Sequence, residues 1–412
     1  MRKFATVFLG LLILPPMLSG THVRGYVKSF ALAFTLQDAL SLQESNPPRG
    51  LVANRLRLTF TASLSSRVKF ETAWDLSPDY SEINLEGVFP AATGGGSGMD
   101  YRVVDFQRRI APPPGDPSAG FNLHHNLDRL LVTIRFKGAD LFIGRQAVAW
   151  GSARTVNPTD IIAPFTFNEL DTEERRGVDA LRLRIPLGMM DELDMGWVMG
   201  SDFATAASAF FLRGKFHLLS TDVALILTAF RNHFMAGVDL ARSIGGAGVW
   251  LEAAWVRPWL FNAENPAADD TPYFRFSTGV DFHFSGNVHA FAEYHFSSAG
   301  RGDPAAYPEI QESAAFKDGT VYLLGRHYLC AGATAQATPL LPLSCMVIWN
   351  LSDGSLTLAP SAEYNVAQNV YLSAGAYIGT GATPVMTPPG PIMRSEFGTW
   401  PHMFYTAFRF YF

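Results

Sequence analysis

Apolar and polar side chains alternate with a period of two along most of the chain, from Gly25 to Phe412. Successive side chains of a β-strand point to opposite faces, so each alternating segment predicts a strand with one apolar and one polar face. The segments run to about ten residues, the length that a tilted strand needs to cross a bilayer. The predicted strands are 25–36, 51–61, 67–76, 128–137, 140–149, 178–186, 192–200, 207–217, 221–230, 233–242, 248–257, 273–284, 288–297, 325–337, 341–350, 355–364, 370–379 and 400–412.

The connections between these segments tend to alternate between short and long, although three on the long side are also short, near Asn232, near Asp202 and at 352–354. The short set includes 64–66, 138–139, 188–191, 218–220, 285–287 and 367–369, and the long set includes 77–127, 150–177, 258–272, 298–324 and 380–399. Outer-membrane barrels have short periplasmic turns and longer outer loops. The sequence therefore predicts an all-β fold, a transmembrane antiparallel up-and-down β-barrel of about 18 strands, with 16 as the alternative.

The longest structured connection, 150–177, is flanked by two clear strands. Leu181 and Leu183 alternate with Arg182 and Arg184, which predicts an apolar outer face and a cationic inner face. A loop this long is usually functional or disordered, and its apolar residues 161, 162, 165 and 167 argue against disorder. We predict that it folds into the lumen as a constriction. The alternative is an ordered surface loop packed on its neighbours.

Both ends of the chain indicate export to an outer membrane. Arg2 and Lys3 precede an apolar core that Pro15 ends, so residues 1–20 are predicted to be a signal peptide and 21–412 a single barrel domain. The last strand carries Phe at 404, 408, 410 and 412, which looks like the terminal strand that bacterial outer-membrane barrels present to their assembly machinery. The expected location is the bacterial outer membrane, with its lipid and the barrel assembly machinery as partners.

Composition excludes several other classes. The 412 residues are 48% hydrophobic and 17% charged, and no internal run approaches the roughly 18 apolar residues of a spanning helix. Lys and Arg number 32 against 37 Asp and Glu, which excludes a generic nucleic-acid-binding surface. The two cysteines, Cys330 and Cys345, fall on opposite faces of their strands, so we expect two free thiols. Without a CxxC or CxxCH motif, neither a zinc ribbon nor covalent haem is expected.

Alternation also assigns charges to the lumen, because Arg or Lys on a lipid face costs roughly 2–4 kcal/mol at mid-depth. One wall is predicted to be cationic, with Arg55, Arg57, Lys69, Arg135, Lys137, Arg145, Arg182, Arg184, Arg213 and Lys215 opposed by Glu71 and Asp75. The other is predicted to be more acidic, with Glu252, Asp281, His283, His289, Glu293, His295 and Glu363 beside Arg275 and Arg409. Such a transverse field selects solutes by charge. The alternative is that these charges pair and fill the lumen.

Metal binding and catalysis are not expected. His283, His289 and His295 lie on neighbouring predicted strands, but their spacing matches no ligand signature. No G-x-S-x-G motif or local Ser/His group indicates a nucleophile with its base. We predict neither a metal, nor a cofactor, nor an enzyme.

One group of motifs carries a family resemblance. Gly144-Arg145-Gln146, Trp150-Gly151, Asn157-Pro158-Thr159-Asp160 and then 174–179 (ERRGVD) resemble the proteobacterial outer-membrane barrels that carry a GRQ…WG…NP-x-D segment, near the alginate-export and anion-selective porin groups. The resemblance implies a channel of 16–18 strands with an inward loop.

The loop itself supplies candidate contacts. Arg145 could hold the loop to the wall through Asp160, Glu169 or Asp171, by a charge-assisted contact. The candidate pore-lining and constriction residues are Arg145, Arg182, Arg184, Arg55, Arg57, Arg135, Asp160, Glu169, Asp171 and Arg154.

Two functions fit these predictions. The first is an outer-membrane porin that passes small, anionic, hydrophilic solutes. The second is a barrel sleeve that holds multihaem cytochromes in an electron-transfer conduit, which needs no haem site of its own.

Overall fold

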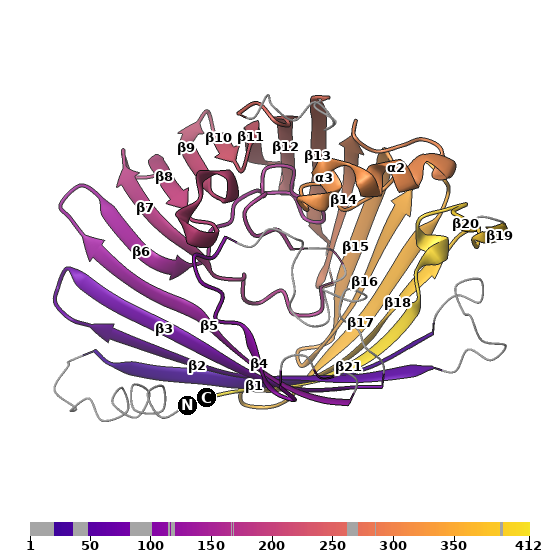
Figure 1. Ribbon diagram of the computed structural model, residues 1–412, viewed down its shortest axis with the longest axis horizontal. Helices are drawn as coiled ribbons and strands as arrows, with labels where there is room; N and C mark the ends of the chain where they lie inside the picture. Colours follow the sequence, from indigo (N-terminus) through magenta and orange to yellow (C-terminus); the bar gives the residue numbers. More distant parts are fainter. Residues whose placement is uncertain are drawn as a thin grey trace.

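Strands dominate the computed structural model of this chain, which describes residues 20–35, 48–82, 101–113, 116, 120–165, 167, 169–261, 271–284, 286–387 and 390–412. Within these ranges, eighteen antiparallel strands close into one barrel (Figure 1), because the first strand pairs with both the second and the last. The alternative of 16 strands is thereby excluded. The predicted signal peptide, residues 1–20, lies outside the described residues except for Gly20.

The barrel strands each overlap one predicted segment. They are β1 (His22–Thr35), β2 (Arg49–Ser63), β3 (Val68–Ser81), β5 (Gly120–Arg135), β6 (Asp140–Gln146), β7 (Val178–Pro186), β8 (Glu192–Val198), β9 (Ala209–Leu218), β10 (Thr221–Phe230), β11 (His233–Ile244), β12 (Ala247–Arg257), β13 (Tyr273–Phe284), β14 (Val288–Ser297), β15 (His327–Thr338), β16 (Leu341–Asn350), β17 (Leu356–Ala367), β18 (Val370–Thr380) and β21 (His402–Tyr411). However, β5 begins at Gly120 rather than at 128, and β6 ends at Gln146 rather than at 149. Three short strands in the long connections were not predicted: β4 (Arg108–Ala111), β19 (Val385–Thr387) and β20 (Gly390–Ile392).

Short helices also lie in the long connections. They are η2 (Ser201–Phe203), η3 (Thr205–Ala207), η4 (Pro304–Ala306), α2 (Tyr307–Glu312), α3 (Ala314–Lys317) and η5 (Phe397–Thr399). Across the described ranges, no helix has the length and apolar character required to traverse a membrane.

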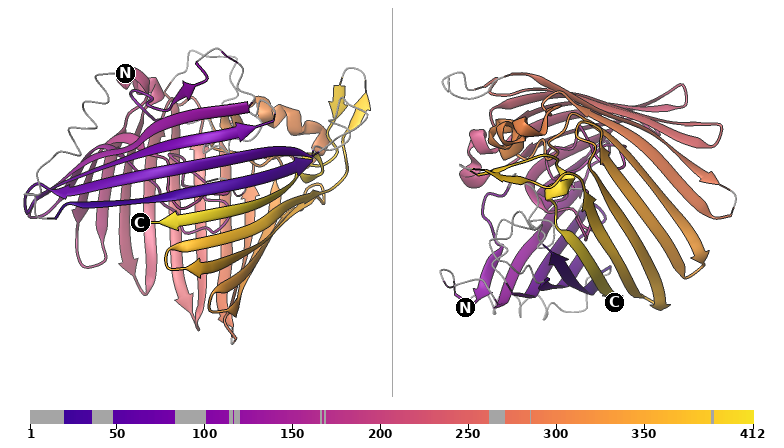
Figure 2. Two further views of the ribbon diagram at one scale, coloured as in Figure 1. Left: turned by 90° about the horizontal axis from the view of Figure 1, so that it is seen from below. Right: turned by 90° about the vertical axis from the view of Figure 1, so that its right-hand side faces the viewer.

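The two ends of the barrel differ as predicted. Hairpins such as β9–β10 and β17–β18 close with two residues between strands at one end, called here the turn end. The last residue, Phe412, is hydrogen-bonded to Gly25 near the start of β1 at this same end. The long connections lie at the opposite end, called here the loop end (Figure 2).

The register separates an outer and an inner face on each strand. In β21, Phe404, Phe408 and Phe410 are exposed, whereas the intervening Tyr405 and Arg409 line a cavity inside the barrel. Aromatic residues on the outer face suit the boundary between lipid and water. The two cysteines are free thiols, with Cys330 buried and Cys345 exposed, because they lie on opposite faces of paired strands.

The apolar core lies inside the barrel, where the 147–177 connection meets the wall. Ile161 and Ile162 are fully buried there and pack with wall residues that include Phe211, Ile226 and Met235. This explains β10, which is apolar on both faces: Leu225 is exposed outside while Ile226 is buried inside. The inner wall is therefore apolar at those positions of β9 to β11 that the loop covers.

Candidate channel constriction and lumen site

The segment 151–159 crosses the lumen and docks on two buried carboxylates of the far wall. Glu252 of β12 accepts hydrogen bonds from the backbone amides of Ser152, Ala153 and Thr159 at 2.8–3.1 Å and from the hydroxyl of Thr159 at 2.7 Å. Glu252 is 0% exposed, so its carboxylate accepts these hydrogen bonds in place of water.

Glu293 of β14 repeats this arrangement one step further along the loop. It accepts hydrogen bonds from the backbone amides of Arg154, Thr155 and Val156 at 2.6–3.2 Å, and from Trp250 Nε1 at 2.9 Å. A buried carboxylate is costly unless charge-assisted hydrogen bonds satisfy it. Here the loop backbone supplies those donors, so the loop and the acidic wall stabilise each other.

The WG and NPTD motifs shape this docking segment. Trp150 Nε1 donates to the Thr159 carbonyl at 2.7 Å, and Asn157 Nδ2 donates to the Ala153 carbonyl at 3.0 Å. Gly151 has φ +109°, and a Cβ there would lie 2.7 Å from a Glu252 oxygen. Only glycine fits both the backbone conformation and the close approach. The motif therefore encodes a loop fold that presents consecutive amides to a carboxylate.

The return leg of the loop is held by ion pairs to the opposite wall. Asp171 is bound by Lys28 Nζ at 2.8 Å and Arg55 Nη1 at 3.2 Å, and Glu173 is bound by Lys28 at 2.6 Å. Although burial opposes it, the Lys28 and Arg55 charges hold the pKa of Asp171 below its usual value. Arg57 reaches Glu174 at 3.7 Å and is paired with Asp75 and Asp128 at about 3 Å.

Within the loop, Arg175 holds Asp160. Arg175 Nη1 lies 2.7 Å from Asp160 Oδ2 and also donates to the Ala163 carbonyl. Burial raises the pKa of Asp160 to about 6, and the Arg175 charge opposes this shift. The loop thus has its own internal tie besides its anchors on both walls, and Figure 1 shows its path inside the ring of strands.

The predicted partner of Arg145 is wrong. Arg145 is 2% exposed and pairs with Asp179 at 2.8 Å, not with Asp160, Glu169 or Asp171. It also donates to the carbonyls of Leu127 and Val104. The reason is local: Asp179 lies directly opposite Arg145 in the β6–β7 register, while the loop acids lie nearer other cations.

The other predicted residues separate into two groups. Arg55, Arg57, Asp160, Asp171 and Arg154 meet in the loop and its anchors. Arg182 and Arg184 lie on the inner face of β7 and pair along the wall with Asp194 at 2.5 Å and Glu192 at 3.3 Å. Arg135 is exposed near the turn end, and Glu169 is half-buried within the loop.

Sequence reasoning placed Glu252 and Glu293 in the lumen but missed their role as anchors, and it missed Lys28 altogether. The available signal was a carboxylate on each of two predicted strands, facing inward without a nearby cation. Lys28 is 0% exposed and lies 4.2 Å from the centroid of the Tyr26 ring, so its burial could not be inferred from one strand alone.

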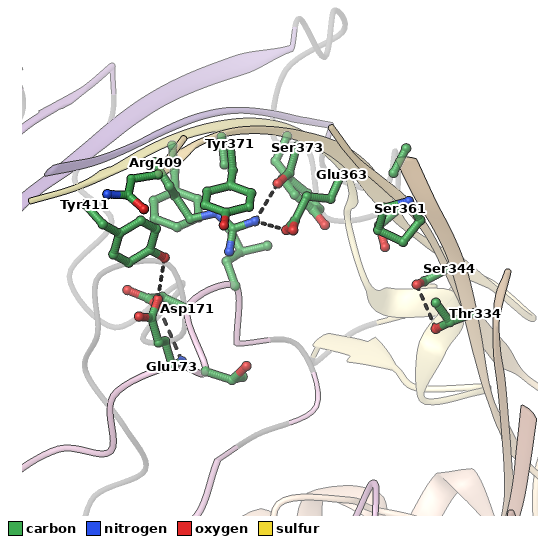
Figure 3. A pocket seen from close by; sticks show the side chains of 18 residues that line it. Asp171, Glu173, Thr334, Ser344, Ser361, Glu363, Tyr371, Ser373, Arg409 and Tyr411 are labelled. Carbon is green, nitrogen blue, oxygen red and sulfur yellow. Dashed lines mark hydrogen bonds and ion pairs between the residues drawn. The ribbon is translucent and has the colours of Figure 1, made fainter. Parts of the chain in front are cut away.

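A cavity of about 760 Å³ lies between the return leg of the loop and the inner faces of β15 to β18 and β21 (Figure 3). Arg409 contacts Glu363 and Ser373 on one side, and Tyr411 donates to Glu173 of the loop at 2.7 Å on the other. Hydroxyl and tyrosine side chains line most of the space between. This arrangement can hold a small polar molecule below the constriction.

The three histidines of the acidic wall are divided between two separate contacts. His283 and His289 lie with ring centroids 4.5 Å apart, and His295 is buried with Nδ1 at 2.9 Å from Ser277 Oγ. In the described part of the chain, no three His, Cys, Asp or Glu side chains are grouped as a metal ion requires.

Comparison with known proteins gives matches of structure alone. No family model and no curated protein sequence matches the chain. Among solved structures, it is similar to OccAB2 of Acinetobacter baumannii (8% identity, 95% of this chain and 98% of that chain, TM-score 0.58). It is also similar to OccD3 (OpdP) of Pseudomonas aeruginosa (10% identity, 96% and 92%, TM-score 0.56) and to OprD of the same organism (8% identity, 95% of each, TM-score 0.55).

These structures are outer-membrane porins, and identities of 8–10% establish a shared fold rather than a shared solute. The closed barrel, its exposed aromatic outer face and its asymmetric ends place this chain in the bacterial outer membrane. The predicted proximity to the alginate-export group stays a prediction.

Proposed function

We propose that the protein is an outer-membrane channel that passes small hydrophilic solutes, and that the 147–177 loop is its constriction. The observation that carries this proposal is the anchoring of one loop on both walls, at Glu252 and Glu293 on one side and at Lys28 and Arg55 on the other. A loop held across the lumen limits the size of what can pass, while the barrel around it stays fixed.

The sleeve hypothesis is not favoured. A sleeve needs a lumen wide enough to hold another protein, and here the loop occupies the lumen and buries apolar residues such as Ile161 and Ile162 against its wall. Removing the loop from that position would expose this apolar surface and leave Glu252 and Glu293 without their amide donors.

A preference for anions is the finer part of the proposal. It is supported by Arg154, whose side chain is 49% exposed, and by the partly exposed Arg184. These two arginines and most other lumen cations are paired with carboxylates, which weakens the field that a solute meets. We therefore propose a small preference. Removal of residues 1–20 as a signal peptide and delivery by the barrel assembly machinery belong to the same proposal.

Deletion of residues 153–173 tests the constriction. Gln146 and Val178 are paired neighbours, so a short glycine linker can close the gap without moving the strands. The single-channel conductance of the purified protein in planar bilayers should rise severalfold on deletion, because the loop no longer fills the lumen.

A matched deletion of residues 385–392 removes the β19–β20 hairpin of another loop-end connection and should leave conductance unchanged. Equal conductance in the 153–173 deletion and the full chain would show that the loop is not the constriction. A full chain that conducts no ions would end the channel proposal itself.

A further inference from the structure

The 760 Å³ cavity between the loop and β21 has a lining unlike the rest of the lumen (Figure 3). Its volume falls within the range of small-molecule sites. Asn369 lies in the turn between β17 and β18, and Pro342 is the second residue after the turn between β15 and β16, so the cavity extends toward the turn end of the barrel. A solute that has passed the constriction would meet this lining next.

The charges of the cavity are arranged in pairs. Arg409 is bound by Glu363 and donates to Ser373 at 2.7 Å. Asp171 and Glu173 share the Lys28 ammonium, and Arg55 completes the balance at Asp171. Three carboxylates are thus matched by three cations. A charged solute would therefore have to compete with an existing ion pair for each charged group of the cavity.

Paired carboxylates keep acceptor capacity. A carboxylate offers about four lone-pair positions, and an ion pair uses only part of them. Serine and threonine hydroxyls around the cavity both donate and accept; they are Thr172, Thr334, Ser344, Ser361 and Ser373. This lining matches a neutral molecule with many hydroxyl groups better than it matches an anion, because the cations of the cavity are already paired with carboxylates.

Three tyrosine rings lie in the lining beside apolar residues such as Phe30 and Leu170. Tyr371 and Tyr411 lie with ring centroids 5.9 Å apart at 83°, and Tyr405 follows on the same face of β21. Aromatic faces carry partial negative charge and attract partially positive C–H groups. A ring with hydroxyls at its edge and C–H groups on its faces satisfies both parts of the lining at once.

We propose that this cavity is a binding site for a neutral, cyclic, polyhydroxylated solute of mono- or disaccharide size. The proposal deepens the channel function and rests on it for the route of the solute, while the binding itself depends only on the cavity. Tyr371 and Tyr411 would pack against the ring faces, and Glu363, Glu173 and Arg409 would exchange hydrogen bonds with its hydroxyls.

Calorimetric titration of the detergent-solubilised full chain tests binding independently of conduction. Maltose is the cyclic neutral probe, sorbitol the open-chain neutral probe and gluconate the anionic probe. Maltose should bind at millimolar concentration, with sorbitol and gluconate each at least about fivefold weaker. Tyr371→Leu should weaken maltose roughly five- to tenfold through loss of the ring, and Tyr371→Phe, which keeps the ring, by about twofold or less.

Tyr364→Leu is the matched control, because Tyr364 is exposed on the outer face of the adjoining β17. It should leave maltose binding unchanged. Gluconate binding more tightly than maltose, an unchanged affinity in Tyr371→Leu, or no heat with maltose would each overturn the proposal. If the protein conducts ions but does not bind maltose, only the proposed binding site is refuted. If it binds maltose but conducts no ions, only the proposed channel function is refuted.

Discussion

Glu252 and Glu293 show how single residues organise the lumen. Both are almost fully buried, and neither is neutralised by a close side-chain cation in the contacts described above. Instead, the loop amides converge on them as amides converge on an anion at a helix N-terminus. Each charge-assisted hydrogen bond of this kind stabilises by roughly 1.5–3 kcal/mol, so a pair of carboxylates can hold a loop that lacks regular structure.

The substitution Glu252→Gln should loosen the loop. Glutamine has one acceptor oxygen, and its NH2 group would face either the Ser152 and Ala153 amides or the Thr159 amide, so one set of donors would lose its acceptor. We expect a loss of about 3 kcal/mol in loop docking. In single-channel recordings this should appear as a larger mean conductance with added current noise.

Glu71→Gln is the control, since Glu71 lies on the inner face of β3 and its carboxylate is 3.8 Å from Lys69. It should leave the current trace as in the unmodified protein. If the mean conductance and current noise of Glu252→Gln equal those of the unmodified protein, Glu252 does not anchor the loop.

Among the elements, the 381–401 connection at the loop end is held by a second buried carboxylate site. Glu396 is 2% exposed and accepts hydrogen bonds from Asn350 Nδ2 at 2.8 Å, from the Leu324 amide at 3.0 Å and from Tyr328. Its own amide donates to Asp353 at 2.7 Å. The connections after β14, β16 and β20 are thereby tied together above the barrel.

This tie should weaken as pH rises. Burial raises the pKa of Glu396 to about 7 from its usual 4.5, with Asp353 contributing in the same direction. A carboxyl whose folded pKa is raised stabilises fully below about 4.5 and loses that contribution as pH rises through about 7. Amide hydrogen exchange of 393–400, corrected for its intrinsic pH dependence, should be slower at pH 5.5 than at pH 8.

Glu396→Gln should abolish that difference, because glutamine does not titrate. Glu312→Gln on α2 is the control and should keep it, since Glu312 is exposed to solvent. Equal corrected exchange at both pH values in the unmodified protein would rule out Glu396 as the source of pH sensitivity.

At the scale of the whole molecule, the lumen is close to charge balance. Cations of β2, β7 and β9 face carboxylates of β3, β5 and β8, and the acidic wall is engaged by loop amides. Ion pairs of this kind reduce the potential that a passing ion meets. The predicted transverse field is therefore weaker than the inward residues alone suggest.

A reversal potential in a tenfold KCl gradient measures the remaining selectivity. We expect a small value on the anion side, well below the roughly 59 mV of an ideally selective pore. The double substitution Arg154→Gln with Arg184→Gln should shift it toward cations, because both side chains are partly exposed in the lumen.

Arg242→Gln should not shift the reversal potential, since the register of β11 places Arg242 on the outer face. An unshifted potential in the double variant would remove Arg154 and Arg184 from the ion path. A potential on the cation side in the unmodified protein would refute the anion preference.

The sequence by itself determined the barrel. In each strand, apolar side chains face the lipid and polar side chains face the lumen, so the local sequence shows which face is which. Leu225 and Phe404 on the outside and Arg409 on the inside are examples. The approximate positions of all eighteen strands, the short turns and the two free thiols follow from this alternation of apolar and polar residues. The inward course of the loop was also predicted, because its apolar residues needed a surface to cover.

Only the tertiary structure decided which groups meet in the lumen. Arg145 lies opposite Asp179 rather than a loop acid, Lys28 contacts Asp171 across 143 residues of sequence, and Glu252 binds amides that no side-chain pattern marks. Such contacts depend on how a closed barrel brings distant strands to one interior and how far a loop reaches across it. Period-two alternation fixes the face on which a side chain lies, but it carries no information about the partner on the opposite wall.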